Sequence, residues 1–140
     1  MALPKVLVDS GFLYVLFRKN DPDHQAVRTV FDSLDAEFIV PQVVLTEACW
    51  LFNRAGGMPL VATFLELLTS ARIPLEPANY VDVYRASQLM RQYVGTKLDF
   101  VDCCILALAE RLEITQVATL DRRDFSIMRT RHGRYLDILP

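Results

Sequence analysis

The chain has 140 residues, of which 52% are hydrophobic and 23% charged, and these values indicate one globular domain over residues 1–140. No apolar run approaches the ~20 residues of a membrane span, and no signal peptide precedes the first strand-like segment, so we expect a cytoplasmic protein without a membrane partner. The formal net charge of −2 does not indicate nucleic-acid binding, although a metal-bound acidic site would hide negative charge from this count.

Strands and helices alternate along the N-terminal half of the chain. Residues 5–8 predict a short buried strand, and residues 10–18 a short helix. The pair Asp21-Pro22 predicts the start of a helix that reaches residue 34, because Asp caps helices and Pro suits the first helical position. A second strand is expected over residues 38–40. Two helices should follow, over residues 42–54 and 59–70, separated by the glycine pair at 56–57.

The C-terminal half continues the alternation. A third strand is expected over residues 73–75 and a helix over 77–93. A strongly apolar helix over 99–112 precedes a fourth strand over 116–120 and a short fifth strand over 135–138. Strands that alternate with helices in this way predict an α/β fold with a parallel sheet and right-handed crossovers.

The cysteines Cys49, Cys103 and Cys104 lie inside apolar helical patterns. Their odd number argues against a disulfide framework, and their spacing is not that of a zinc site. We therefore expect them to act as small core side chains.

Four acidic residues fall where a parallel sheet would gather them at one edge: Asp9, Glu47, Asp102 and Asp121. Asp9 directly follows the first strand and Asp121 the fourth, and the carboxyl ends of parallel strands open onto the functional crevice. Clustered carboxylates repel one another unless a cation lies between them. Oxygen ligands favour a hard divalent cation, Mg²⁺ or Mn²⁺.

Each of these acids also has a purely structural interpretation. Asp9 and Asp121 could cap the segments that follow their strands, and Glu47 could lie on an exposed polar stripe. Asp102 could be an acid at a hydrated helix end. It is, however, the only charge between residues 100 and 109, where desolvating an unpaired ion costs more than the helix dipole returns.

Taken together, the order strand–Asp, helix–Glu, buried helix–Asp and strand–Thr-x-Asp resembles the PIN-domain ribonucleases, and within them the VapC-type toxins. The matching segments span nearly the whole chain: Val8–Ser10, Pro41–Glu47, Asp99–Ala109 and Thr119–Phe125. The resemblance implies a three-layer α/β/α sandwich around a parallel sheet of four to five strands in the order 3-2-1-4-5. Cys103 stands where the family usually has alanine.

The resemblance also implies a site and an activity. The acids that would be catalytic and hold metal are Asp9, Glu47, Asp102 and Asp121. The residues that would orient them are Ser10, Asp99 and Thr119. The activity implied is hydrolysis of RNA with one or two Mg²⁺ or Mn²⁺ ions, with Glu47 orienting or deprotonating the attacking water. Arg122 and Arg123 begin a basic stretch that reaches residue 134, which is either an RNA contact or a solvated face.

The partners implied by the resemblance are a second copy of the chain and a small antitoxin protein that blocks the site. Such an antitoxin would place a helix in an apolar groove. The residues that could line this groove, unless they pack in the core, are Phe12, Leu13, Tyr14, Leu16, Trp50, Leu51 and Phe52.

Two alternatives remain at this stage. The chain could be a PIN scaffold that only binds other proteins. It could also be a receiver-like, Mg²⁺-binding signalling domain, but that class needs an acidic pair after its first strand and a lysine after its fifth. This sequence has one acid after the first strand, and its last lysine is Lys97.

Overall fold

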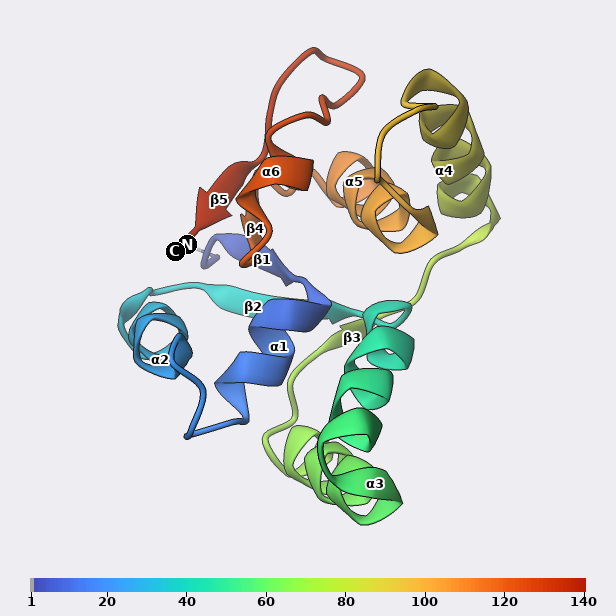
Figure 1. The fold of residues 1–140 in the computed structure, drawn as a ribbon. Helices are drawn as coiled ribbons and strands as arrows, with labels where there is room; N and C mark the ends of the chain where they lie inside the picture. Colours follow the sequence, from blue (N-terminus) through green and yellow to red (C-terminus); the bar gives the residue numbers. More distant parts are fainter. Residues whose placement is uncertain (1) are drawn as a thin grey trace.

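The computed structural model describes residues 2–140 as a five-stranded parallel sheet with helices on both faces (Figure 1). The strands are β1 (Lys5–Val8), β2 (Glu37–Pro41), β3 (Leu75–Glu76), β4 (Gln116–Ala118) and β5 (Asp137–Leu139), and their order is β3-β2-β1-β4-β5. All four pairings are parallel, and β1 lies at the centre between β2 and β4. This order confirms the sandwich and the strand order expected from the resemblance. It also rules out the receiver-like alternative, whose sheet has the order 2-1-3-4-5.

The helices divide between the two faces according to the direction of the crossovers. The chain first moves outward through α1 (Ser10–Leu16), α2 (His24–Ser33) and α3 (Val44–Ser70). It then returns across β1 to β4 through α4 (Tyr80–Gln92) and α5 (Phe100–Leu112), and α6 (Arg122–Phe125) leads to β5. Right-handed crossovers in opposite directions place the two groups of helices on opposite faces, and Figure 1 shows this arrangement.

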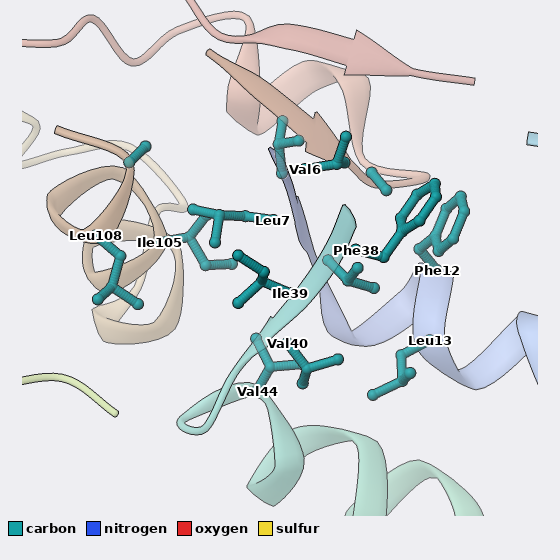
Figure 2. Close-up of a cluster of buried hydrophobic side chains, with 14 of the residues drawn as sticks. Val6, Leu7, Phe12, Leu13, Phe38, Ile39, Val40, Val44, Ile105 and Leu108 are labelled. Carbon is teal, nitrogen blue, oxygen red and sulfur yellow. The ribbon is translucent and has the colours of Figure 1, made fainter. Parts of the chain in front are cut away.

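The core forms on both faces of the two central strands (Figure 2). Side chains alternate along each strand, so Leu7 and Ile39 face Ile105 of α5, whereas Val6 and Phe38 face the opposite side. On that side, the rings of Phe12 and Phe38 lie 6.5 Å apart between centroids. Strands buried on both faces explain the continuous apolar runs in the sequence.

Helix α5 contains the longest uninterrupted buried stretch of any described helix. All residues from Cys103 to Ala109 are buried, which confirms the strongly apolar helix read from the sequence. Cys103 and Cys104 are buried free thiols, and Cys49 is a partly buried one, as expected for core side chains. Among the described residues, no helix combines the length and apolarity that crossing a membrane requires.

Several helix boundaries differ from the sequence predictions because local hydrogen bonds decide them. Helix α2 begins at His24 rather than after Asp21, since the Asp21 carboxylate accepts a bond from the amide of Asp23 and closes a turn first. Helix α4 begins at Tyr80 rather than Pro77, because Asn79 and Asp82 form a reciprocal capping box there.

Helix α3 joins the two helices predicted over 42–54 and 59–70. The expected interruption is present as a kink, because Gly57 has a φ of 76° and a ψ of −174°, a conformation that L side chains rarely adopt. Pro59 follows immediately, where a new helical turn tolerates its missing amide hydrogen.

The strand and turn differences are smaller. Strand β3 covers residues 75–76 rather than 73–75, β4 ends at Ala118 rather than residue 120, and β5 covers 137–139 rather than 135–138. The short helix α6 was not predicted, beyond the possibility that Asp121 caps a turn.

Helices α4 and α5 are joined by ion pairs as well as by apolar contacts. The side chain of Asp82 is only 1% exposed, and its two oxygens accept bonds from Nε of Arg111 at 2.9 and 3.1 Å. Arg85 makes a two-point contact with the largely buried Glu110, at 2.7 and 3.1 Å. These pairs are satisfied in place, but removing one partner would leave a buried charge without compensation.

We expect the substitution Arg111→Met to lower the free energy of unfolding by about 3 kcal/mol, the lower end of the cost of breaking a buried pair, because Asp82 keeps its bond from the amide of Asn79. Urea denaturation measures this loss. The matched control is Arg28→Met, which removes an exposed pair with Asp32 and should cost less than about 1 kcal/mol. Equal losses in the two variants would contradict the role assigned to the Asp82–Arg111 pair.

Candidate active site

Asp9 is the centre of the acidic site and lies at the end of the central strand β1. Its Oδ1 accepts a bond from the amide of Ser10 at 2.7 Å, and its Oδ2 accepts one from the hydroxyl of Thr119 at 2.9 Å. The residue is only 7% exposed. Burial raises the pKa of Asp9, and the negative charges of Asp121 and Asp99 raise it further, against the lowering effect of its two hydrogen bonds.

Thr119 connects Asp9 to Asp121 across the two neighbouring strands. Its hydroxyl donates to Asp9 and accepts a bond from the amide of Asp121 at 2.9 Å, while the residue itself is 1% exposed. The carboxylate of Asp121 in turn caps α6 by accepting from the amide of Asp124 at 3.1 Å. One hydroxyl thus fixes the relative positions of two acids that are 112 residues apart in the chain.

Glu47 reaches the site from the first turn of α3. The hydroxyl of Ser10 donates to its Oε1 at 3.0 Å, so Ser10 contacts Asp9 through its backbone and Glu47 through its side chain. Burial raises the pKa of Glu47, as do the charges of Asp99 and Asp9. Glu47 therefore faces the acidic site and not an independent polar stripe.

Asp99 and Asp102 form a reciprocal capping box at the start of α5. The Asp99 carboxylate accepts from the amide of Asp102 at 3.0 Å, and the Asp102 carboxylate accepts from the amide of Asp99 at 3.2 Å. Burial raises the pKa of Asp102 from 3.8 to about 8, and the charges of Asp99 and Asp9 add to this effect. Asp102 thus lies at the partly exposed end of the helix, as the structural alternative proposed, and also beside the other acids.

Asp124 belongs to the same cluster, although only its spacing of three residues from Asp121 relates it to the site in the sequence. Burial raises its pKa to about 6, and the carboxyl group of Asp121 contributes to the increase, as does the charge of Asp99. The charge of Arg123 acts in the opposite direction. The short helix α6 brings Asp124 back toward Asp121, and because that helix was not predicted, the contact could not be read from the sequence.

The structure therefore gathers every acid that the sequence predicted for the site and adds one. The six residues, which we call the acidic cluster, are Asp9, Glu47, Asp99, Asp102, Asp121 and Asp124. In residues 2–140, no Lys, Arg or His nitrogen lies within 4.0 Å of their carboxylate oxygens. Their mutual repulsion has no compensating ion pair within the described chain.

The carboxylate oxygens of the acidic cluster suit a hard cation, but they do not already surround a single metal position. Within the described part of the chain, no three His, Cys, Asp or Glu side chains form a ready-made metal cage. Four carboxylates keep one oxygen that receives no bond from a backbone amide or a hydroxyl of residues 2–140: those of Glu47, Asp99, Asp102 and Asp121. An open set of carboxylate oxygens fits Mg²⁺, which keeps several of its waters and demands few protein ligands.

Two adjoining clefts give access to the acidic cluster. One, of about 420 Å³, is lined by Asp9, Ser10, Gly11, Leu120 and Asp121. The other, of about 410 Å³, is lined by Ser10, Thr46, Glu47, Trp50 and Leu51. Because Ser10 lines both, the two clefts meet at the point where Asp9 and Glu47 are joined.

The basic stretch after Asp121 is partly structural. Arg122 is exposed and donates to the backbone carbonyl of Pro140, and Arg123 is exposed near Asp124. Further along, Arg131 binds Glu110 of α5 through its backbone amide and its side chain, and Arg129 stacks on the ring of Tyr135. The loop is thus attached to α5. Arg122 and Arg123 keep exposed side chains at the edge of the site.

Most of the residues suggested to line an apolar groove for an antitoxin pack in the core instead. Phe12, Leu13, Leu16 and Phe52 are buried in the core, because α1 packs against α3 and places the ring of Phe12 on Phe38 of β2. A helical apolar pattern does not distinguish a docking groove from a core contact. Of the residues named for the groove, only Trp50 is largely exposed, at 58%.

Comparison with known proteins agrees with this geometry. The PIN domain family matches residues 6–130 of the chain. Among curated proteins, the chain is similar to Ribonuclease VapC26 of Mycobacterium tuberculosis (strain ATCC 25618 / H37Rv), with 25% identity over 135 residues that cover 96% of this chain and 100% of the relative.

Solved structures share the fold at lower identity. The chain is similar to Mycobacterium tuberculosis VapC20, described as a sarcin-ricin loop cleaving toxin, with a TM-score of 0.81, 18% identity and coverage of 96% and 99% of the two chains. It is also similar to VapBC2 from Rickettsia felis bound to a promoter DNA fragment, with a TM-score of 0.71, 12% identity and coverage of 97% and 99%. For FitAcB from Neisseria gonorrhoeae the TM-score is 0.69, with 18% identity and 96% coverage of both chains.

We expect Asp102→Asn to stabilise the protein in metal-free buffer, and to do so more at pH 8 than at pH 4. An acid whose folded-state pKa is raised from 3.8 to about 8 makes the wild-type protein progressively less stable as pH rises through that window. Asparagine keeps the oxygen that caps the amide of Asp99 but carries no charge.

Thermal melts in EDTA at pH 4, 6 and 8 measure this effect, with Asp35→Asn as an exposed control outside the cluster. An equal gain in melting temperature at all three pH values would show that charge repulsion at Asp102 is not the source of the gain. A lower melting temperature of the variant than of the wild-type protein at pH 8 would contradict the predicted stabilisation.

Proposed function

Because this chain belongs to the PIN-domain family, we propose that it is a ribonuclease that hydrolyses RNA phosphodiester bonds with Mg²⁺ or Mn²⁺, and that it is the toxin of a VapBC-type toxin–antitoxin pair. The observation that carries the nuclease proposal is the convergence, at the carboxyl edge of the sheet, of six carboxylates that form no ion pair with a basic side chain of residues 2–140. If these acids had a structural role, we would expect basic side chains to balance their charge in ion pairs. In a metal-dependent phosphodiesterase, the bound metal balances the charge instead.

The residues divide into those that hold metal and those that orient them. Asp9, Glu47, Asp102 and Asp121 would hold one or two ions, some of them through water. When bound, the metal supplies a water of lowered pKa and positive charge against the phosphate oxygens. Ser10, Asp99 and Thr119 orient the carboxylates, as their hydrogen bonds to Asp9, Glu47 and Asp102 support.

The protein side of the reaction follows from the same contacts. Glu47 has a raised pKa and one carboxylate oxygen without a backbone or hydroxyl donor, so it can accept a proton from the attacking water or orient that water. Thr119 and Ser10 keep Asp9 fixed, so that the site needs little rearrangement. Arg122 and Arg123 lie beside the cleft and would contact RNA phosphates in a salt-dependent way.

The toxin assignment rests on the relatives. VapC26 is named a ribonuclease, VapC20 is described as cleaving the sarcin-ricin loop, and other structures of the same fold are toxin–antitoxin complexes. By analogy, a small antitoxin would bind this chain and block the acidic cluster, and the active form would be a homodimer. A chain that only binds other proteins would have no need to keep a repelling cluster that destabilises it.

We expect the purified protein to cleave RNA with Mn²⁺ or Mg²⁺ and to lose all cleavage in EDTA. Asp9→Asn should lower the cleavage rate by more than the 10–100-fold typical of residues that support a metal ligand. The stabilisation of the wild-type protein by Mn²⁺ in thermal melts should disappear in the same variant. Asp35→Asn is the control for both measurements. Full activity of Asp9→Asn, or cleavage that continues in EDTA, would refute the metal-dependent mechanism.

For the toxin role, we expect induced expression of the wild-type chain in a bacterial host to arrest growth, and expression of Asp9→Asn at the same level to leave growth unchanged. Co-expression of the small protein encoded next to its gene should restore growth and should inhibit cleavage in vitro. Cleavage in vitro without any arrest would favour a housekeeping nuclease instead.

A further inference from the structure

Two arginines stack on two aromatic rings in the groove between α1 and α3. On α3, Cζ of Arg54 lies 5.3 Å from the centroid of the Trp50 ring. Beside α1, Cζ of Arg18 lies 5.1 Å from the ring centroid of Tyr14, and the same guanidinium donates to the Tyr14 hydroxyl. Together with Leu51 between them, these residues form what we call the α1–α3 strip.

The strip is continuous with the acidic cluster. A cleft of about 340 Å³ is lined by Tyr14, Arg18, Leu51, Arg54 and Ala55, and Leu51 also lines the cleft that contains Glu47 and Ser10. Along α3, Glu47, Trp50 and Arg54 are separated by three and four residues, so they follow one face of the helix. Arg54 therefore lies about two helical turns, or ~10 Å along the axis, from the acid at the site.

The two guanidinium groups of the strip form no ion pair with a carboxylate of residues 2–140. Four other arginines pair with carboxylates: Arg28, Arg85, Arg111 and Arg131. In residues 2–140, neither Arg18 nor Arg54 has an acidic oxygen within 4.0 Å. Trp50 is 58% exposed, so Arg54 covers only part of its ring.

The chemistry of the strip indicates what could occupy it. An apolar helix docked there would have to desolvate two guanidinium groups without satisfying them, at a cost in affinity. A nucleotide has both complementary parts, since a base stacks on an aromatic ring or a guanidinium plane, and phosphates accept from arginine. The positive charges of the strip also suit a chain of phosphates, which would reach the acidic cluster from that direction when the cluster holds its cation.

We propose that the α1–α3 strip is a nucleotide-binding subsite for the RNA strand next to the cleaved phosphate. A base stacks on Trp50, and Arg54 and Arg18 bind the phosphates that follow. This assignment rests on the proposed function for the identity of the strand as RNA, but it makes a separate statement about binding that can be measured without cleavage.

Trp50 is the only tryptophan of the chain, so its fluorescence reports on the strip and on the adjoining cleft that Glu47 lines. We expect a single-stranded octauridylate, added to the wild-type protein in EDTA, to quench this emission saturably. Affinity should fall with salt, and the slope of log K against log salt should become shallower by about 0.7 when Arg54 or Arg18 is replaced by alanine. Arg54→Lys should keep the slope, because it keeps the charge. Arg91→Ala, an exposed arginine on α4, should change neither affinity nor slope.

The contact between the base and Trp50 is tested with variants that lack this tryptophan, so its emission cannot be used. Binding is measured instead from the fluorescence anisotropy of a labelled octauridylate. Trp50→Ala should weaken binding about 5- to 150-fold, the loss from removing one base–aromatic stack, and Trp50→Phe should retain much of it. In cleavage assays with Mn²⁺, the Trp50 and Arg54 variants should raise KM while kcat stays close to that of the wild-type protein. Melting temperatures establish that each variant is folded.

Each result separates this proposal from the nuclease proposal. Tripolyphosphate that quenches Trp50 as strongly as the oligonucleotide would overturn the base contact. Octaglutamate that binds more tightly than octauridylate would identify the strip as a surface for an acidic protein instead. Normal cleavage with unchanged KM in all variants would overturn the subsite and leave the nuclease intact, whereas quenching without any cleavage would support the subsite and count against the nuclease.

Discussion

The hydrogen bond from Thr119 to Asp9 is the contact on which the acidic site depends. It joins the ends of β4 and β1, two neighbouring parallel strands in the middle of the sheet. Because β1 is central, its carboxyl end is also close to the starts of α3 and α5, and Glu47 of α3 and Asp102 of α5 lie beside the same point. Ser10 continues the connection to Glu47. Two hydroxyl groups therefore connect acids from three separate segments of the chain: Asp9, Glu47 and Asp121.

This arrangement exchanges stability for function. Burial, together with the charges of neighbouring acids, raises the pKa of four of the six carboxylates, and a raised carboxyl pKa costs folding free energy at neutral pH. The apolar layers on both faces of β1 and the buried pairs between α4 and α5 offset that cost. The N-termini of α1, α5 and α6 point toward the same acids and favour their charged form to a limited extent. The fold is stable in spite of the site, which is a feature expected of catalytic centres.

The sequence predicted the elements that carry the site better than it predicted their ends. The strand–Asp and strand–Thr-x-Asp patterns identified Asp9, Thr119 and Asp121, because short buried strands have few other interpretations. The strand order came from the family resemblance, since alternation alone does not fix it. Local hydrogen bonds moved the starts of α2 and α4, and Asp124 was missed because α6 is too short to show periodicity. The exposed role of Trp50 could not be separated from the buried role of Phe52, two residues away on the same apolar helix.

Three of the acids, Asp9, Asp99 and Asp121, are also the N-cap residues of α1, α5 and α6. An N-cap requires a short side chain that can fold back onto the first backbone amides, and aspartate meets this requirement whereas glutamate does so poorly. Glu47 caps nothing, since it lies inside the first turn of α3, and it is the one glutamate among the six. At these three positions the choice of aspartate thus follows from secondary structure, and a homologue that shortened or shifted one of these helices would have to change the reach of its acid as well.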